Sequence, residues 1–219
     1  MKVSPFILNE FKAFDIATPV NEVKAFFTET PFTHFPILND GMFVGLISET
    51  DAQCLEENEE EIGNFQNLFY KFYSDSQANI LDVLHIFAAR NSNIIPALNE
   101  EQEYLGYFEL LDVLNVYNES PFFNTEGTYL LLKKETRDFS FSEVSQIAEI
   151  NKAKILGIFI SQMTDATVEV TLKILPQDLN EVIQAFRRYN YDVLSNHNED
   201  LHIEDLKDRS NYLQKYLNI

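Results

Sequence analysis

The chain has 219 residues, 45% of them apolar, which is enough to build a substantial buried core. Its net charge is −19, and the first 118 residues hold 5 Lys and Arg against 19 Asp and Glu. Binding to nucleic acid or to an anionic membrane surface needs clustered basic residues, so this composition excludes both as partners.

The sequence also argues against a membrane-spanning or secreted protein. No apolar run reaches the ~18 residues of a transmembrane helix, and the N-terminal MKVSPFILNEFKAF lacks the apolar core of a signal peptide. Cys54 is the only cysteine, so disulfide bonds cannot hold the fold together. We therefore expect a cytoplasmic protein.

The first predicted helix covers TPVNEVKAFF, residues 18–27. Thr18 is the expected N-cap and Pro19 the expected first helical residue. Apolar residues then recur at helical spacing, at Val20, Val23, Phe26 and Phe27.

Each of two predicted helices is followed by a segment, and the two segments are similar in sequence. The segment THFPILNDGMFVGLISETDA (33–52) aligns with NIIPALNEEQEYLGYFELLDV (93–113), with offsets of 60 and then 61 residues. The aligned pairs are Pro36 with Pro96, Gly45 with Gly106, and Asp51 with Asp112. Each segment predicts two strands around a tight turn and then a helix, so the first half of the chain is an internal repeat of order β-α-β-β-α.

A charged stretch, LEENEEEIG (55–63), separates the repeats and is interpreted as a helix end and a solvated linker. The helix of the second repeat is predicted within SQANILDVLHIFAAR (76–90), with Ser76 as its N-cap. Its apolar face contains Ile80, Val83, Leu84 and Phe87.

From about residue 127 the pattern changes to strands and helices in the order β-α-β-β-α-β. This order is that of the ferredoxin-like split βαβ arrangement. Ser140 and Glu143 have the spacing of a capping box at the first of its two helices. The residues after 197 could form an end helix through Leu206, Leu213 and Leu217.

The paired β-α-β-β-α units, each with an apolar–Gly–apolar–apolar–x–x–x–Asp segment, resemble tandem cystathionine-β-synthase (CBS) domains. The next unit resembles an ACT-like domain, and the combination is similar to small CBS proteins of the acetoin-utilisation-like group. This resemblance implies an α+β fold. The expected domains are CBS domain 1 (1–62), CBS domain 2 (63–120), an ACT-like domain (127–197) and a helical tail (198–219).

The resemblance implies that an adenine nucleotide or nucleoside binds in clefts between the two CBS domains. In the motif, the glycine admits a close ligand, a Ser or Thr faces a phosphate at a helix N-terminus, and the aspartate accepts the ribose hydroxyls. Carried over by position, the first site consists of Ile16, Ala17, Thr18, Phe35, Pro36, Gly45, Ser48 and Asp51. The second and weaker site consists of Ile95, Pro96, Gly106, Glu109 and Asp112.

The two expected sites differ chemically, because Glu109 stands where the first site has Ser48. Two like charges ~4 Å apart repel by about 4 kcal/mol at an effective dielectric constant near 20. The second site should therefore disfavour phosphate, accept an unphosphorylated nucleoside, recruit a cation or stay empty.

Other features have simpler interpretations. The acidic block from Glu56 to Glu61 could bind a hard divalent cation, but a solvated surface explains it as well. Cys54 has no partner at catalytic or metal-binding spacing and is interpreted as an inert, packed thiol. The first turn of the ACT-like domain, KKETRDFS (133–140), lacks a glycine, which favours oligomerisation over amino-acid binding.

No nucleophile constellation, zinc-ligand spacing, P-loop or dinucleotide motif is present, so we expect a regulatory protein and no enzyme, cofactor or metal. The expected regulatory ligand is AMP, ADP, ATP or adenosine, and its effect would pass through rearrangement of a homodimer. The alternatives are a ligand-free scaffold that dimerises and docks a client protein, and a divalent-cation sensor.

Overall fold

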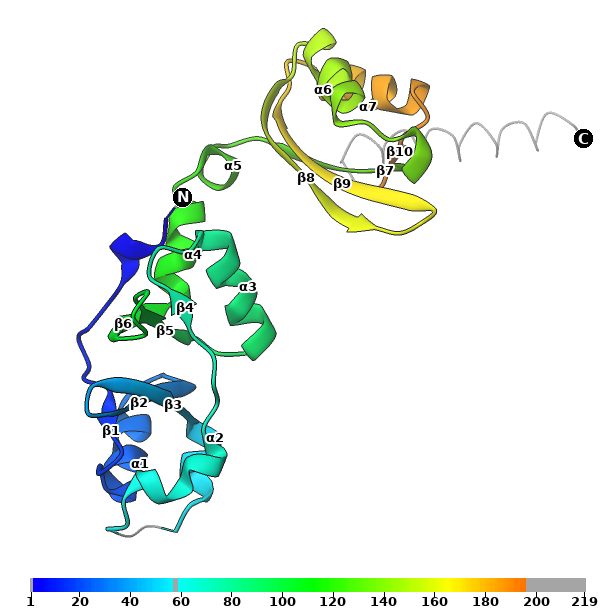
Figure 1. Ribbon diagram of the computed structural model, residues 1–219. Helices are drawn as coiled ribbons and strands as arrows, with labels where there is room; N and C mark the ends of the chain where they lie inside the picture. Colours follow the sequence, from blue (N-terminus) through cyan, green and yellow to red (C-terminus); the bar gives the residue numbers. More distant parts are fainter. Residues whose placement is uncertain (1, 57–58, 196–219) are drawn as a thin grey trace, which may run out of the picture. The chain divides into compact units, whose positions relative to one another are not determined.

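The computed structural model describes residues 2–56 and 59–195. The chain divides into an N-terminal unit, residues 1–117, and a C-terminal unit, residues 118–219 (Figure 1). Within the described ranges, no helix has the length and apolar character needed to cross a membrane. The predicted tail (198–219), with Leu206, Leu213 and Leu217, lies outside the described residues.

The N-terminal unit contains two copies of one fold, which confirms the predicted order β-α-β-β-α. The first repeat, residues 14–54, comprises β1 (Phe14–Asp15), α1 (Val20–Glu29), β2 (His34–Asn39), β3 (Met42–Ser48) and α2 (Glu49–Cys54). The second repeat, from residue 74, comprises β4 (Ser74–Asp75), α3 (Ile80–Arg90), β5 (Ile94–Leu98), β6 (Tyr104–Glu109) and α4 (Leu110–Asn118). The strand orders, β1-β2-β3 and β4-β5-β6, are equivalent.

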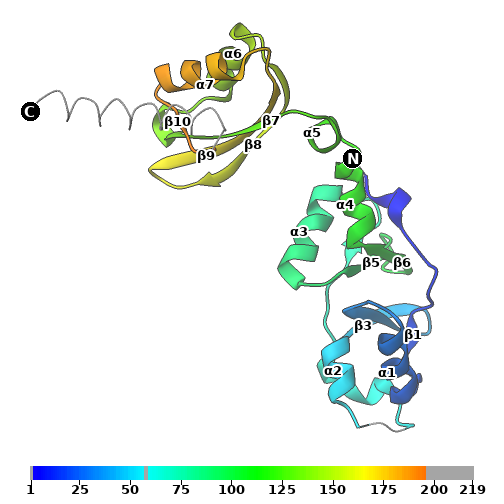
Figure 2. The ribbon, with the colours of Figure 1, turned by 180° about the vertical axis from the view of Figure 1, so that it is seen from behind.

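Each small sheet is extended by a segment from outside its own repeat. After the short helix η1 (Ser4–Phe6), Leu8 pairs with Tyr107 of β6 through bonds of 2.8 and 2.9 Å. After η2 (Ile62–Leu68), Tyr70 pairs in the same way with Leu46 of β3. The N-terminal segment therefore passes the second repeat before it enters β1 of the first, as Figure 2 shows from behind.

The two repeats meet through a reciprocal pair of hydrogen bonds. The backbone N–H of Thr33 donates to Asn93 Oδ1 at 2.9 Å, and the N–H of Asn93 donates to Thr33 Oγ1 at 3.1 Å. These residues are 60 positions apart, as are the aligned prolines, so the contact follows the symmetry of the repeat. The repeats also share their cores, because Tyr107 of the second packs into the aromatic cluster of the first.

Helical spacing explains which faces of α1 and α3 are buried. Val20, Val23 and Phe27 of α1 are at most 2% exposed. Ile80, Val83 and Phe87 occupy the same places in α3. Burying each such side chain contributes about 1.5–3 kcal/mol, so packing, more than helix propensity, stabilises these helices.

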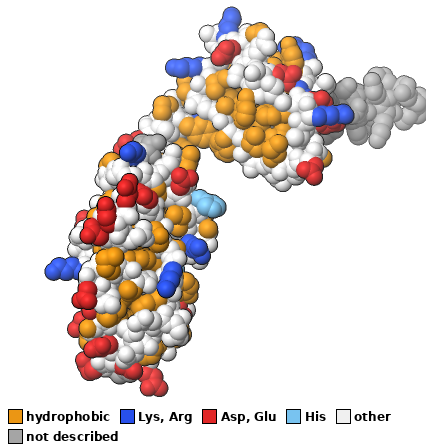
Figure 3. Space-filling model, in the orientation of Figure 1, with side chains coloured by type: hydrophobic (Ala, Val, Ile, Leu, Met, Phe, Trp, Pro, Cys, Tyr) orange, Lys and Arg blue, Asp and Glu red, His pale blue; other side chains and the backbone are white. Residues whose placement is uncertain are grey.

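The C-terminal unit has the predicted β-α-β-β-α-β order. It comprises α5 (Pro121–Asn124), β7 (Thr128–Glu135), η3 (Thr136–Asp138), α6 (Phe141–Ile150), β8 (Lys154–Met163), β9 (Thr167–Leu175), α7 (Leu179–Arg188) and β10 (Asp192–Val193). The antiparallel sheet has the order β10-β7-β9-β8, which is that of a split βαβ fold. Helices α6 and α7 cover one face, while hydrophobic side chains remain visible on the unit's surface (Figure 3).

Candidate functional site

Each duplicated glycine lies where another segment of the chain packs closely against its strand. Gly45 is placed opposite Ile37 just beside a register shift in β2–β3, and Gly106 is opposite Ala97 beside the equivalent shift in β5–β6. A Cβ on Gly45 would come within 2.8 Å of Phe69 Cβ, and one on Gly106 would come within 2.2 Å of the Leu8 carbonyl oxygen. Both glycines have positive φ, at +157° and +146°. Their structural role is thus close approach of the chain's own backbone at a bulge.

Ser48 and Asp51 come together at the junction of β3 and α2. Ser48 is the N-cap of α2, and its Oγ accepts a hydrogen bond from the Asp51 N–H at 3.0 Å. The same hydroxyl donates to Asp51 Oδ2 at 2.5 Å. This contact follows from helix geometry, because the third residue of a helix lies next to the N-cap side chain. The predicted serine and aspartate therefore form one polar group at the end of the strand.

Tyr70 closes this polar group from the side of the linker. Its hydroxyl donates to the same oxygen, Asp51 Oδ2, at 2.9 Å. The hydrogen bond to Asp51 raises the pKa of Tyr70, which therefore keeps its proton and remains a donor. Tyr70 is nevertheless 43% exposed. Sequence reasoning missed it, because its only signal is the aromatic run FYKFY after the linker.

His34 completes the first site. Its side chain is 9% exposed, and its ring lies edge-on to those of Tyr70 and Phe72, with centroids 5.2 and 5.6 Å away. Burial lowers the pKa of His34, and the negative charge of Asp51 only partly opposes that effect. His34 is held opposite Ser48 by the β2–β3 register. The repeat alignment gives Ile94 at the equivalent position, so this histidine is specific to the first repeat.

The predicted adenine-binding residues do not all join this group. Phe35 is fully buried among Phe14, Phe26 and Phe32, while Pro36 lies next to it on β2, opposite Leu46. Residues 16–18 instead contact the linker. Gly63 N–H donates to Ile16 O at 2.8 Å, and Ile62 N–H donates to Thr18 O at 2.9 Å. Ala17 lies exposed between them, with its N–H donating to Asp15 Oδ1.

The second predicted site is acidic and differently covered. Glu109 ends β6 and Asp112 lies in the first turn of α4. Burial raises the pKa of Glu109, and the negative charges of Asp112 and Glu10 raise it further. Glu10 belongs to the N-terminal segment that pairs with β6 through Leu8. An added phosphate would meet three carboxyl groups here, so the geometry disfavours an anionic ligand.

The remaining residues of the second site are part of the protein interior. Ile95 is fully buried in the core of the second repeat, and Pro96 is buried opposite Tyr107 in the sheet. Neither Asp51 nor Asp112 lines any of four cavities found among the described residues.

A cavity of about 880 Å³ belongs to the C-terminal unit and lies beside the turn at 133–140. Lys134 lines it and pairs with Glu143 at 2.5 Å, while the Tyr191 hydroxyl donates to Glu143 at 2.7 Å. Burial alone would raise the pKa of Glu143, but these hydrogen bonds and the Lys134 charge together lower it. Because Glu143 is engaged in this way and Ser140 makes no side-chain capping bond, the predicted capping box is wrong.

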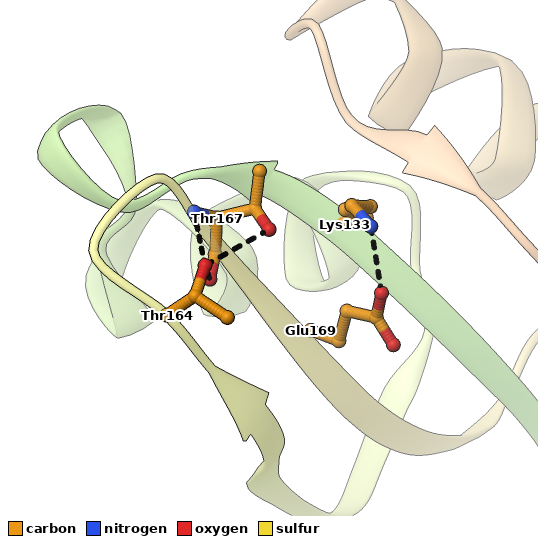
Figure 4. Close-up of polar contacts among 4 residues, drawn as sticks. All are labelled: Lys133, Thr164, Thr167 and Glu169. Carbon is orange, nitrogen blue, oxygen red and sulfur yellow. Dashed lines mark hydrogen bonds and ion pairs between the residues drawn. The ribbon is translucent and has the colours of Figure 1, made fainter.

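The other side of β7 carries a separate ion pair. Lys133 Nζ lies 2.8 Å from Glu169 Oε1 of β9, directly across the strands (Figure 4). In the β8–β9 hairpin, Thr167 N–H donates to Thr164 Oγ1, as the same view shows. These contacts connect neighbouring strands, and the charge of Lys133 is paired with that of Glu169.

The remaining candidates are Cys54 and the acidic block between the repeats. Cys54 is an exposed free cysteine, so the prediction that its thiol is packed in the interior is wrong. Among the described residues, no three His, Cys, Asp or Glu side chains are grouped so that they could hold a metal ion. The acidic block lies partly outside the described residues, and of its described members Glu59 accepts a hydrogen bond from Asn21.

A family profile of the CBS domain matches residues 5–53. An uncharacterised protein of Methanocaldococcus jannaschii is 24% identical over 114 residues, which are 52% of this chain and 43% of that protein. The chain thus spans less than half the length of this curated relative.

Two solved structures illustrate the structural comparison. A CBS domain pair/ACT domain protein of Thermotoga maritima is 20% identical, with a TM-score of 0.49, covering 54% of this chain and 98% of that one. CBSX2 in complex with AMP is 14% identical, with a TM-score of 0.46, covering 53% of this chain and 95% of that one.

Proposed function

We propose that this chain is a regulatory protein whose N-terminal unit binds an adenine nucleoside or nucleotide at Ser48 and Asp51 of the first repeat. The match of residues 5–53 to the CBS domain supports this proposal, because it includes both residues. The proposed ligand class is adenosine, AMP, ADP or ATP. Membership of the acetoin-utilisation-like group stays a prediction, as does the domain division at residues 62, 120 and 127.

One observation carries the proposal. Asp51 Oδ2 accepts two hydroxyl donors at once, from Ser48 and from Tyr70. A ribose diol also presents two neighbouring hydroxyl donors, and a carboxylate is the usual protein group that accepts them. The Tyr70 hydroxyl thus holds the place of a sugar hydroxyl, and its exposed side chain can turn outwards to release the carboxylate.

Charge favours ligands with few phosphates. The first 118 residues carry 19 acids and 5 bases, and Lys24, one of those bases, donates to the Leu55 carbonyl oxygen at 2.8 Å. Each added phosphate charge brings further repulsion from these acidic side chains. We therefore expect affinity to fall in the order adenosine, AMP, ADP, ATP at low ionic strength.

Isothermal titration of the whole chain with these four compounds tests the proposal. Asp51→Asn should weaken adenosine binding about tenfold or more, because it removes the charged acceptor of the ribose hydroxyls. Asp112→Asn is the matched control from the second repeat and should leave that binding unchanged. Tyr70→Phe should strengthen it, because the competing hydroxyl is gone.

If neither the wild type nor Tyr70→Phe binds any of the four at about 1 mM, the proposal is wrong. The second candidate function, a ligand-free scaffold, would then stand. The specific observation in its favour is that Asp51 Oδ2 already accepts hydrogen bonds from two of the protein's own hydroxyl groups. A scaffold would hold its partner equally well with and without nucleotide.

A further inference from the structure

The second repeat has a cavity with a basic lining beside α3. Its volume is about 380 Å³, and it is lined by the segment 71–73, which leads into β4, and by one face of α3. Lys71 belongs to the segment, and His85 and Arg90 belong to the helix. No Asp or Glu is among the described residues that line this cavity. We call it the basic cavity.

The two bases of the basic cavity have no acidic partner. The first 118 residues hold only 5 Lys and Arg, and two of these, Lys71 and Arg90, line this one cavity. Neither forms an ion pair with any of the described residues. Arg90 instead lies over the ring of Phe72, 5.7 Å from its centroid. A cation is favourable at the C-terminus of α3, which explains Arg90 but not Lys71.

The first repeat shows how the equivalent space is filled. The offset of 60 residues that relates β1 to β4 and α1 to α3 pairs Lys71 with Phe11 and Ile86 with Phe26. The rings of Phe11 and Phe26 pack edge to face, with centroids 5.7 Å apart. An aromatic contact therefore occupies the place that Lys71 and Ile86 have in the second repeat.

The same offset relates two further positions of the cavity. Ala89 corresponds to Glu29, and Arg90 corresponds to Thr30. Compared with the first repeat, the second thus has a base for an aromatic residue, an alanine for an acid, and a base for a threonine. Each difference makes the cavity more positive. The backbone fold requires none of them, because the first repeat has the same fold without them.

We propose that the basic cavity binds a small phosphate monoester, with the phosphate held by Lys71 and Arg90 and the organic part packed against Tyr73. Ammonium and guanidinium groups are the side chains that most often bind phosphate, and the guanidinium can do so through two parallel hydrogen bonds. The Tyr73 side chain is 42% exposed, so its ring is accessible to a ligand. A volume of 380 Å³ is near the lower end for ligand cavities, which suits a compact ligand.

The basic cavity is separate from the group formed by Ser48 and Asp51. None of the residues proposed for the adenine ligand lines it. The acidic side chains of the N-terminal unit repel anions over most of its surface, so a compact ligand with its charge inside the cavity is favoured over an extended polyanion. The site does not depend on adenine binding.

Titration of the whole chain with phenyl phosphate, followed by the backbone amide signals in NMR spectra, tests the site. The signals of residues 71–73, Ala89 and Arg90 should shift, with a dissociation constant of about 1 mM or less. Inorganic phosphate should bind more weakly, because it has no organic part to pack against Tyr73. Equal affinities for the two probes, or no binding of phenyl phosphate at about 10 mM, would overturn the proposal.

Four substitutions that each make the net charge more negative by one unit distinguish a site from general attraction. Lys71→Gln, and Ala89→Glu and Arg90→Thr with the residues of the first repeat, should each weaken phenyl phosphate binding about tenfold or more. Lys12→Gln is the control, because Lys12 is an exposed base of the same unit that does not line the cavity. Equal weakening by Lys12→Gln would show that only net charge matters and would overturn the site.

Asp51→Asn separates this site from the proposed adenine site. It should leave phenyl phosphate binding unchanged, although it should weaken adenosine binding. Arg90→Thr should have the opposite selectivity. If Asp51→Asn weakens phenyl phosphate binding as much as Arg90→Thr does, the phosphate lies at the first site and the basic cavity is not a separate one.

Discussion

At the scale of single residues, Asp51 and His34 are the groups whose environment departs most from that of the second repeat. Asp51 is held by two hydroxyl donors, while its counterpart Asp112 lies beside Glu109. His34 is buried against Tyr70, where the second repeat has an isoleucine. Duplication therefore preserved the backbone and changed the chemistry.

The lowered pKa of His34 predicts a loss of stability at acidic pH. The unfolded chain binds a proton with the ordinary pKa of 6.5, but the folded chain does so only at lower pH, mainly because the ring is buried. The unfolded state then holds more protons, so stability falls as pH drops through the unfolded value. Thermal melting at about pH 7.5 and about pH 5.5 should show a smaller loss for His34→Gln than for the wild type.

The exposed His85 provides the control for this prediction. His85→Gln should keep the pH dependence of the wild type, because that side chain lies on the surface of α3. A wild-type loss that persists unchanged in His34→Gln would show that another group is responsible.

At the scale of elements, local contacts between side chains and the backbone decide where the helices begin. The N-cap of α3 is Asn79, whose Oδ1 accepts from the Leu81 N–H at 3.0 Å, so the prediction of Ser76 is wrong. Pro19 takes the N-cap position of α1, and the Thr18 hydroxyl instead accepts from the Asp15 N–H. The two cap predictions are wrong for a local reason. In each segment several polar side chains can bond to nearby backbone groups, and the sequence does not say which of them caps the helix.

The bulge in β6 gives the prediction for this scale. Gly106→Ala should destabilise the chain by about 2–4 kcal/mol, because the new Cβ would overlap the backbone of Leu8. Gly41 has φ +82° at the turn between β2 and β3, and a Cβ there meets nothing within 4 Å. Gly41→Asn is the control and should cost about 0.5 kcal/mol or less, since Asn tolerates positive φ. Urea unfolding of both variants measures the difference, and equal losses would contradict the argument.

At the scale of the whole molecule, the N-terminal unit is closed by segments remote in sequence. Leu8 completes the sheet of the second repeat, although residues of the first repeat lie between them in the chain. Val3 is fully buried in the core of the second repeat as well. The two repeats are therefore held together by backbone pairing as well as by their shared core.

This arrangement predicts that a change near the N-terminus weakens the second repeat. Leu8→Pro removes the N–H that donates to the Tyr107 carbonyl oxygen and should cost about 1–3 kcal/mol. Hydrogen exchange should show faster exchange in β5 and β6. Leu8→Val keeps both backbone bonds and is the control, and protection unchanged in Leu8→Pro would refute the closing role of this segment.

The sequence by itself determined the fold class, the order of elements and the position of the duplicated motif. These follow from local periodicity and from self-similarity, which each stretch of chain carries without reference to the rest. Helix faces such as Val20, Val23 and Phe27 were correctly predicted for the same reason. The resemblance to CBS domains also grouped the serine and aspartate of the first site, and a helix turn brings these two side chains into contact.

Only the tertiary structure decided what surrounds that pair. Tyr70 reaches Asp51 because the segment after η2 pairs with β3. Leu8 contacts Gly106 because the N-terminal segment pairs with β6. An apolar cavity between α3 and α4 likewise exists only because the strands set these two helices on either side of it. Such contacts join residues distant in sequence, and no local pattern encodes which distant segment will fill a given space.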